Sequence, residues 1–164
     1  MNSSTAQPSQ RLGEILIRRG LITPGQLELA LQEQRHSREF LGMILTRMEF
    51  IQPRVLLATL SEQFKIPHEE LPVERVDWSA AKQFPQSILA GINGFPVRAD
   101  GESVTVAIAN PLDAWGLSVI ENAAGFRKVK PVLVLESELA AVKRAFTASS
   151  WRTIADKLNS DGPS

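Results

Sequence analysis

The pattern of hydrophobic positions repeats along the N-terminal part of the chain. Residues 11–34, RLGEILIRRGLITPGQLELALQEQ, align without a gap on residues 40–63, FLGMILTRMEFIQPRVLLATLSEQ, 29 positions later. Eleven of the 24 aligned positions are identical, far more than unrelated segments share. A gapless tandem repeat of this length is typical of one supersecondary unit used twice.

Each copy of this repeat predicts a helix, a tight turn and a second helix. In the first copy, the apolar spacing over residues 12–16 predicts a short helix with one apolar face. Gly20 stands where a left-handed residue ends such a helix. Thr23 is then expected to cap the second helix, with Pro24 at its first position and Gln26 completing a capping box. The two copies together predict a compact layer of four helices.

The second half of the chain has the pattern of a small sheet with helices. Pro67 and Pro72 interrupt the helical periodicity, so a subdomain boundary is expected there. Short helices are expected over 79–84 and 85–90, followed by two apolar runs, 94–99 and 104–109, around Asp100-Gly101. That dipeptide between two strand-like runs predicts a hairpin.

Beyond the hairpin, the pattern predicts a helix, a strand and a last helix. The helix after Asn110-Pro111 carries Leu112, Trp115, Val119 and Ile120 on one side and stops at Gly125, and Trp115 is interpreted as a core residue. Residues 129–135 form the third strand, and Ser137 is expected to cap the last helix. We interpret the segment Asn110–Asp113, NPLD, as a helix cap.

The predicted fold class is α+β, with an N-terminal four-helix tandem repeat packed on a small C-terminal antiparallel sheet that has helices on one face. The expected parts are a disordered leader at 1–10, the helical repeat over 11–66, an α/β subdomain over 67–147, and a tail or linker over 148–164 in which a short amphipathic helix is allowed.

Composition narrows the functional classes. Eighteen basic residues balance eighteen acidic ones, so no overall field favours nucleic acid or anionic lipid. The chain has no cysteine, which excludes disulfides and thiolate metal sites and suits the cytoplasm. No apolar run approaches the roughly 20 residues of a membrane span. We therefore expect a cytoplasmic protein without nucleic-acid binding or direct membrane insertion.

The sequence also lacks the motifs of catalysis. No glycine-rich run followed by Lys-Ser/Thr forms a P-loop. The two histidines, His36 and His68, have no partner at metal-ligand spacing and are interpreted as solvated loop residues. We therefore expect no enzyme and no bound metal.

The repeated motif resembles the N-terminal domain of type II secretion and type IV pilus assembly ATPases. The resemblance lies in the opening Arg-Leu-Gly, the glycine of the turn, the leucines and the closing Gln, and covers nearly all of residues 11–147. That family includes MshE-type domains that bind cyclic di-GMP. It implies a non-catalytic regulatory module that binds this nucleotide and couples it to a secretion or pilus assembly machine. The implied partners are an ATPase core or an inner-membrane platform protein, which would also hold the module at the inner membrane.

The same resemblance implies how the ligand is held. A guanidinium such as Arg11 suits the O6 and N7 acceptors of guanine, and backbone amides at Leu-Gly could approach a phosphate. Leucines would form an apolar floor under the purine, while two glutamine amides supply directional hydrogen bonds. The ligand-contacting positions implied are Arg11, Leu12, Gly13, Leu27, Leu31, Gln34, Phe40, Leu41, Gly42, Leu56, Leu60 and Gln63.

Other interpretations of these residues stay open. The leucines would be apolar in any four-helix layer. In the second copy, Phe40 replaces the motif's Arg, although an aromatic ring could stack on a base instead. Glu49 replaces the glycine of the turn, which is expected to be rebuilt, and its carboxylate would repel phosphates. The alternative function is a protein–protein docking domain of the same machinery with a degenerate, non-binding nucleotide site.

Overall fold

The computed structural model describes residues 8–160. The chain divides into two compact units, the first ending at Thr59 and the second beginning at Leu60. Of the leader expected at 1–10, residues 1–7 lie outside the described residues, whereas residues 8–10 form the first turn of a helix. Among the described residues, no helix is both long and apolar enough to cross a membrane.

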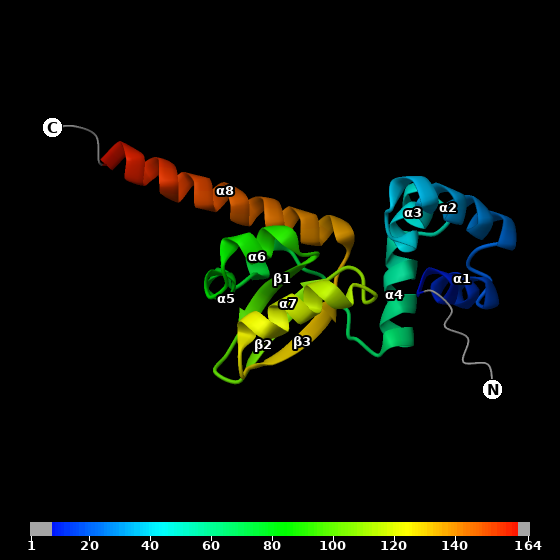
Figure 1. Cartoon of the computed structure of the whole chain (residues 1–164), viewed down its shortest axis with the longest axis horizontal. Coiled ribbons are helices and arrows are strands. Elements are labelled where there is room, and N and C mark those ends of the chain that lie inside the picture. The colour runs from blue at the N-terminus through cyan, green and yellow to red at the C-terminus, as the bar shows by residue number, and fades with distance from the viewer. Residues whose placement is uncertain (1–7, 161–164) are drawn as a thin grey trace. The chain divides into compact units, whose positions relative to one another are not determined.

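Four helices carry the two copies of the repeat (Figure 1). They are α1 (Pro8–Arg18), α2 (Pro24–Ser37), α3 (Leu41–Arg47) and α4 (Pro53–Phe64). Each copy is therefore a helix, a turn and a helix, as predicted. Thr23 caps α2 with the expected capping box: its hydroxyl accepts from the Gln26 amide at 3.2 Å, and the Gln26 side chain accepts from the Thr23 amide at 2.9 Å.

The turn between the helices is the same in both copies. Gly20 and Glu49 are both left-handed, with φ of 68° and 59°. The amides of residues 19–21 donate to carbonyls of residues 15–17, and the amides of residues 48–50 donate to carbonyls of residues 44–46 in the same pattern. The expectation that the second turn would be rebuilt is therefore wrong. The shared apolar residues before the turn hold the backbone, and Glu49 adopts the strained conformation.

The second unit contains a three-stranded sheet. Its strands are β1 (Gly94–Ala99), β2 (Ser103–Ile108) and β3 (Lys128–Leu133), in the order β1-β2-β3. The predicted hairpin is confirmed, since β1 and β2 pair antiparallel across Asp100-Gly101. However, β2 and β3 pair in parallel. The predicted antiparallel sheet is thus corrected to a mixed one, because a helix between β2 and β3 returns the chain to the end where β2 began.

Five helical segments precede, separate or follow the three strands along the chain. They are the 3₁₀ turn η1 (Val73–Arg75) and the helices α5 (Trp78–Lys82), α6 (Gln86–Gly91), α7 (Ala114–Ala124) and α8 (Glu136–Ser160). Helix α8 continues far beyond the sheet (Figure 1), so residues 148–160 of the expected tail are helical. In β2, the adjacent residues Val106 and Ala107, which point to opposite faces of the sheet, are both buried. A cover of helices on one face only, as predicted, does not explain this burial.

Two details of α7 differ from the predictions. Its N-cap is Asp113, whose carboxylate accepts from the Gly116 amide at 3.2 Å, whereas Asn110 only bonds the Leu112 amide within the preceding turn. Trp115 is 65% exposed and does not belong to the core. Ile120, which was predicted on the same side, is buried as expected, together with Gly116 and Ala124.

The core of the second unit includes an aromatic cluster. Phe95 of β1 is 1% exposed and meets Phe146 of α8 edge to face at a centroid distance of 5.2 Å. Trp78 lies within about 6 Å of both rings, stacked on Phe146. Helix α8 is thereby anchored to the sheet through its middle.

Candidate functional site

Most leucines of the expected site are core residues. Leu12, Leu41, Leu56 and Leu60 are 2–8% exposed, which leaves little surface for a ligand. Leu27 and Leu31 differ because both are only half-buried on α2. Of the expected apolar floor, the surface therefore presents only these two residues of the first copy.

The two motif glycines serve helix packing. A Cβ atom on Gly13 would lie 2.6 Å from Leu27 Cδ1, and one on Gly42 would lie 2.9 Å from Leu56 Cδ2. In each copy the first helix therefore lies so close to a leucine of the second helix that a side chain in place of the glycine would require that leucine to shift. This packing explains both glycines without a ligand.

Backbone amides at Leu12-Gly13 are not placed to bind a phosphate. Helix α1 begins at Pro8, so these residues lie in its second turn, where amides bond within the helix. In the second copy, Leu41 and Gly42 do open α3, but Gly42 is buried and that helix has only seven residues. The expected phosphate contact at the glycines is thus not supported by the fold.

The expected polar residues are spread over the first copy and the end of the second. Arg11 and Gln63 are exposed. Gln34 is half-buried, and its Nε2 donates to the Glu39 carbonyl at 2.9 Å, which ties the end of α2 to the following loop. Phe40 is 36% exposed and is the extended N-cap of α3. Arg11, Gln34 and Phe40 belong to the first unit, whereas Gln63 belongs to the second.

A groove does form on the first copy, along α2 and against α1. It has a volume of about 250 Å³ and is lined by Ile17, Pro24, Leu27, Glu28, Leu31, Gln32 and Arg35. It brings together Leu27 and Leu31 of the expected set, but not Arg11 or Gln34. The motif comparison missed Glu28, Gln32 and Arg35, although their spacing along one helix places them on the same face as the leucines.

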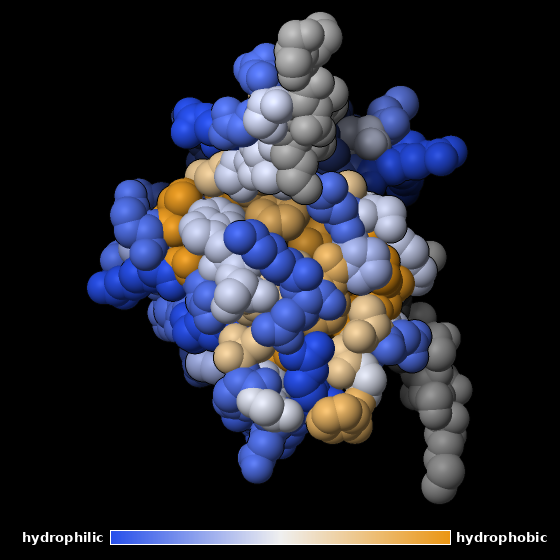
Figure 2. All heavy atoms as spheres, turned by 90° about the vertical axis from the view of Figure 1, so that its left-hand side faces the viewer, coloured by the Kyte–Doolittle hydropathy of each residue, from blue (hydrophilic) through white to orange (hydrophobic). Residues whose placement is uncertain are grey.

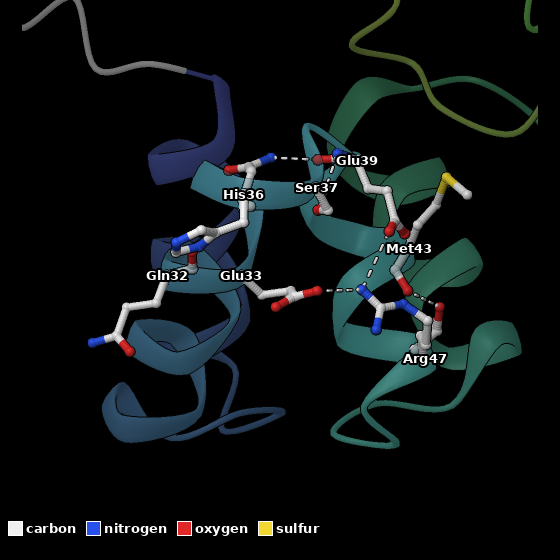
Figure 3. Close-up of polar contacts among 9 residues, drawn as sticks. Gln32, Glu33, His36, Ser37, Glu39, Met43 and Arg47 are labelled. Carbon is white, nitrogen blue, oxygen red and sulfur yellow. Dashed lines mark hydrogen bonds and ion pairs between the residues drawn. The ribbon is translucent and has the colours of Figure 1, made fainter.

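A cluster of charged side chains links α2, the following loop and α3 (Figure 3). Nη2 of Arg47, on α3, lies 3.1 Å from Glu33 on α2 and 3.2 Å from Glu39 in the loop between them. The hydrogen bond to Glu33, followed by the charge of Glu39, raises the pKa of the Arg47 guanidinium. This cation is therefore held by two carboxylates, and its charge is balanced within the protein.

A second groove, of about 440 Å³, lies in the second unit between α6 and α8. Leu89, Phe95 and Phe146 supply apolar walls. Several of its polar groups already have partners, since Gln86 donates to Ser150 at 2.7 Å and the Lys143 ammonium donates to the Ile92 carbonyl. In the view of Figure 2, hydrophobic side chains are interspersed with hydrophilic ones, and some of them project at the surface.

Within residues 8–160, no group of three or more His, Cys, Asp or Glu side chains is arranged to hold a metal ion. His36 lies in α2, not in a loop, and its Nδ1 is 2.9 Å from the Gln32 carbonyl. His68 pairs with Leu133 through the backbone, and its Nδ1 is 3.0 Å from the Ser61 hydroxyl. Both histidines are exposed, but both have local partners.

Comparison with known proteins places this arrangement in a family. Residues 64–149, within the second unit and the end of α4, match the MshEN domain. The type IV pilus assembly ATPase PilB of Myxococcus xanthus is 25% identical over 154 residues, which are 94% of this chain and 27% of PilB. PilB of Thermus thermophilus is 30% identical over 118 residues, which are 71% of this chain and 13% of that protein. The chain thus aligns with about a quarter or less of each relative.

The fold is also that of a solved domain. The structure of MshE with cdg superposes with a TM-score of 0.69 and 23% sequence identity, covering 82% of this chain and 97% of that one. Because this match spans most of both chains, the similarity extends beyond the segment matched by the family. The chain belongs to the MshEN domain family, the N-terminal domain type of PilB- and MshE-like secretion and pilus ATPases.

Proposed function

We propose that this chain is a non-catalytic regulatory module that binds cyclic di-GMP on its tandem motif and couples binding to a secretion or pilus assembly machine. The observation that carries the proposal is the groove on the first copy. It lies along the helices of the motif that resembles cyclic di-GMP-binding domains, and it combines two half-buried leucines of that motif with a cation, Arg35, which directly follows the motif's closing Gln34. MshE, a protein of the same fold, has been solved with cdg, cyclic di-GMP.

The groove residues have the chemistry that a guanine nucleotide needs. Leu27 and Leu31 offer an apolar face for the purine ring, and the Gln32 amide can both donate and accept. The Arg35 guanidinium suits either the O6 and N7 acceptors of guanine or a phosphate. Arg11, exposed on α1, supplies a second cation on the same copy.

A calorimetric titration with cyclic di-GMP tests this function. We expect binding by the native chain, and Arg35→Ala and Arg11→Ala should each weaken it by about tenfold or more, because each removes a charged donor. Arg75→Ala is the matched control, since Arg75 is an exposed arginine of η1 in the second unit. The absence of heat at saturating nucleotide, together with an unchanged melting temperature, would refute the proposal.

A specific observation favours the alternative, a protein-docking role for the second copy. Phe40 and Met43 are 36% and 37% exposed at positions three apart around the start of α3, so they present apolar surface on one side of that helix. A partner from the assembly machine would cover them. Under this alternative, the native chain should capture a purified ATPase core or platform protein equally well with and without cyclic di-GMP, and Phe40→Ser combined with Met43→Ser should abolish that capture.

A further inference from the structure

We infer that the groove between α6 and α8 binds an amphiphilic anion, a single alkyl chain that ends in a carboxylate. This groove lies wholly in the second unit, so the inference is independent of the proposed nucleotide site. Helices α6 and α8 lie side by side (Figure 1), and residues of both line the groove. Its volume of about 440 Å³ falls within the range of about 300–1,000 Å³ that is typical of small-molecule sites.

Two hydrogen bonds between the helices close the groove at its ends. Gln86 of α6 donates to the Ser150 hydroxyl of α8 at 2.7 Å. The Lys143 ammonium of α8 donates to the carbonyl of Ile92, which follows α6. Lys143 and Ser150 lie about two turns, or about 10 Å, apart along α8. The groove is therefore a slot of limited length with a cation at one end, which suits a short chain with a charged head.

The slot is apolar between these two hydrogen bonds. Leu89 and Phe95 are 2% and 1% exposed and close its base. Accessible apolar surface comes from the half-buried ring of Phe146, the exposed Ala90 and the methylene stem of Lys143. Because Phe146 belongs to the aromatic cluster of the core, this wall is fixed in place before a ligand binds. An alkyl chain in the slot would be removed from water on both sides.

The charge at the end of the slot selects an anion. Lys143 is half-buried, and its bond to the Ile92 carbonyl uses one of the three donors of an ammonium group. Burial lowers the pKa of Lys143, although the negative charge of Glu136 opposes this shift. Glu136 does not line the groove, and none of the described residues that do is acidic. A ligand carboxylate would therefore compensate the ammonium for the hydration that burial removes.

A neighbouring hollow adds a second cation to the same end. It is lined by Lys143, Arg144, Thr147 and Ala148, and it shares Lys143 and Thr147 with the groove. Arg144 is exposed there. The chain as a whole has no net charge, so an anionic bilayer exerts no general attraction on it. We therefore assign the groove to a single-chain acyl anion in solution and not to a phospholipid of a bilayer.

Calorimetric titration of the full chain with octanoate, below its critical micelle concentration, tests this assignment. We expect saturable binding of octanoate, and binding of octylamine that is weaker by at least about tenfold because its ammonium would meet Lys143. Lys143→Met keeps an apolar stem but removes the charge, so octanoate should bind about tenfold or more weakly. Lys82→Met, which removes an exposed lysine of α5, is the matched control and should change nothing.

A second variant tests the apolar part of the slot and leaves the bond between Lys143 and Ile92 in place. Ala90→Leu places a larger side chain in the groove from an exposed helical position, so it should abolish octanoate binding in a folded protein. Ala114→Leu, at an exposed alanine of α7, is its control and should bind octanoate as the native chain does. Melting temperatures show whether each variant is folded.

Three results would overturn the inference. The first is a native chain that fails to bind octanoate or binds octylamine equally well. The second is octanoate binding that persists in both Lys143→Met and Ala90→Leu, which would place the ligand elsewhere. The third is sedimentation with phosphatidylglycerol vesicles that is lost in Ala90→Leu, in the absence of octanoate binding, which would assign the groove to a bilayer lipid.

Discussion

The turn residue of the first copy is Gly20, and Arg35 directly follows the last residue of that copy. The equivalent places of the second copy hold Glu49 and Phe64. The backbone hydrogen bonds of the two turns nevertheless agree bond for bond. The apolar spacing that the two copies share fixes the fold of the unit, whereas the positions that differ change which residues reach solvent and which are buried, as exposed Glu28 and buried Leu57 show.

The comparison separates residues that fold the motif from residues that give it a function. Gly13 and Gly42 make the same close approach to a leucine in both copies, so they belong to the first class. The cations of the first copy belong to the second class, since the second copy folds without them. A motif match built mainly from glycines and leucines therefore supports the fold more strongly than it supports a ligand.

The largest expected difference between the copies concerns their paired leucines. Leu56→Ala should destabilise the protein by about 2–5 kcal/mol because Leu56 is only 8% exposed and its removal leaves a cavity. Leu27→Ala should cost less than about 2 kcal/mol, because Leu27 is half-buried beside the groove and part of the space it leaves opens to water. Urea unfolding of the two variants measures both values. Equal losses would show that the first copy is packed as tightly as the second.

The two motif glycines should respond unequally to alanine. In either helix, alanine gains about 1 kcal/mol of helix propensity over glycine. Gly42→Ala meets a buried leucine at 2.9 Å, and overpacking of about 1–3 kcal/mol should exceed that gain. Gly13→Ala meets Leu27, which can move toward the groove, so its net effect should lie near zero. Thermal melts of both variants decide the point, and a larger loss for Gly13→Ala would contradict it.

Exchanging the two turn residues should change the stability of the protein by smaller amounts and with opposite signs. Glu49→Gly should stabilise the protein by about 0.5–1 kcal/mol, because glycine removes the cost of a left-handed side chain but is more flexible when unfolded. Gly20→Glu should destabilise it by a similar amount. Melting temperatures measured in parallel test this symmetry. A stabilising Gly20→Glu would mean that the first turn gains a contact that the second lacks.

Much of the fold could be predicted from local pattern. The helix–turn–helix units, the capping box at Thr23 and the hairpin at Asp100-Gly101 all depend on neighbouring residues, and all were correct. The direction of β3 was missed because strand pairing depends on how the chain crosses over. Trp115 was assigned to the core from its spacing, but the buried side of α7 is formed by Ile120, which was predicted, and by the small residues Gly116 and Ala124, which were not.

The candidate site was harder to predict than the fold. Glycine and leucine positions were carried over from a resemblance, and the sequence gives no measure of burial to show which leucines reach the surface. Arg35 was passed over because it lies just beyond the closing Gln of the motif, in what was expected to be a spacer. Helix α2 extends through Ser37, which places Arg35 on the groove.

The smallest expected effect concerns the ion pairs that link α2, the loop and α3. Arg47→Met removes both contacts, to Glu33 and Glu39, but the Arg47 side chain is 51% exposed, so the stabilisation lost should be slight and screened by salt. Arg18→Met at the equivalent position of the first copy is the matched control. Melting temperatures at low and high ionic strength should show a salt-dependent loss for Arg47→Met only. Because Arg47 is already paired within the protein, Arg47→Met and Arg18→Met should bind the nucleotide with the same affinity at low and at high ionic strength. A loss of affinity in Arg47→Met alone would show that the second copy contributes to binding.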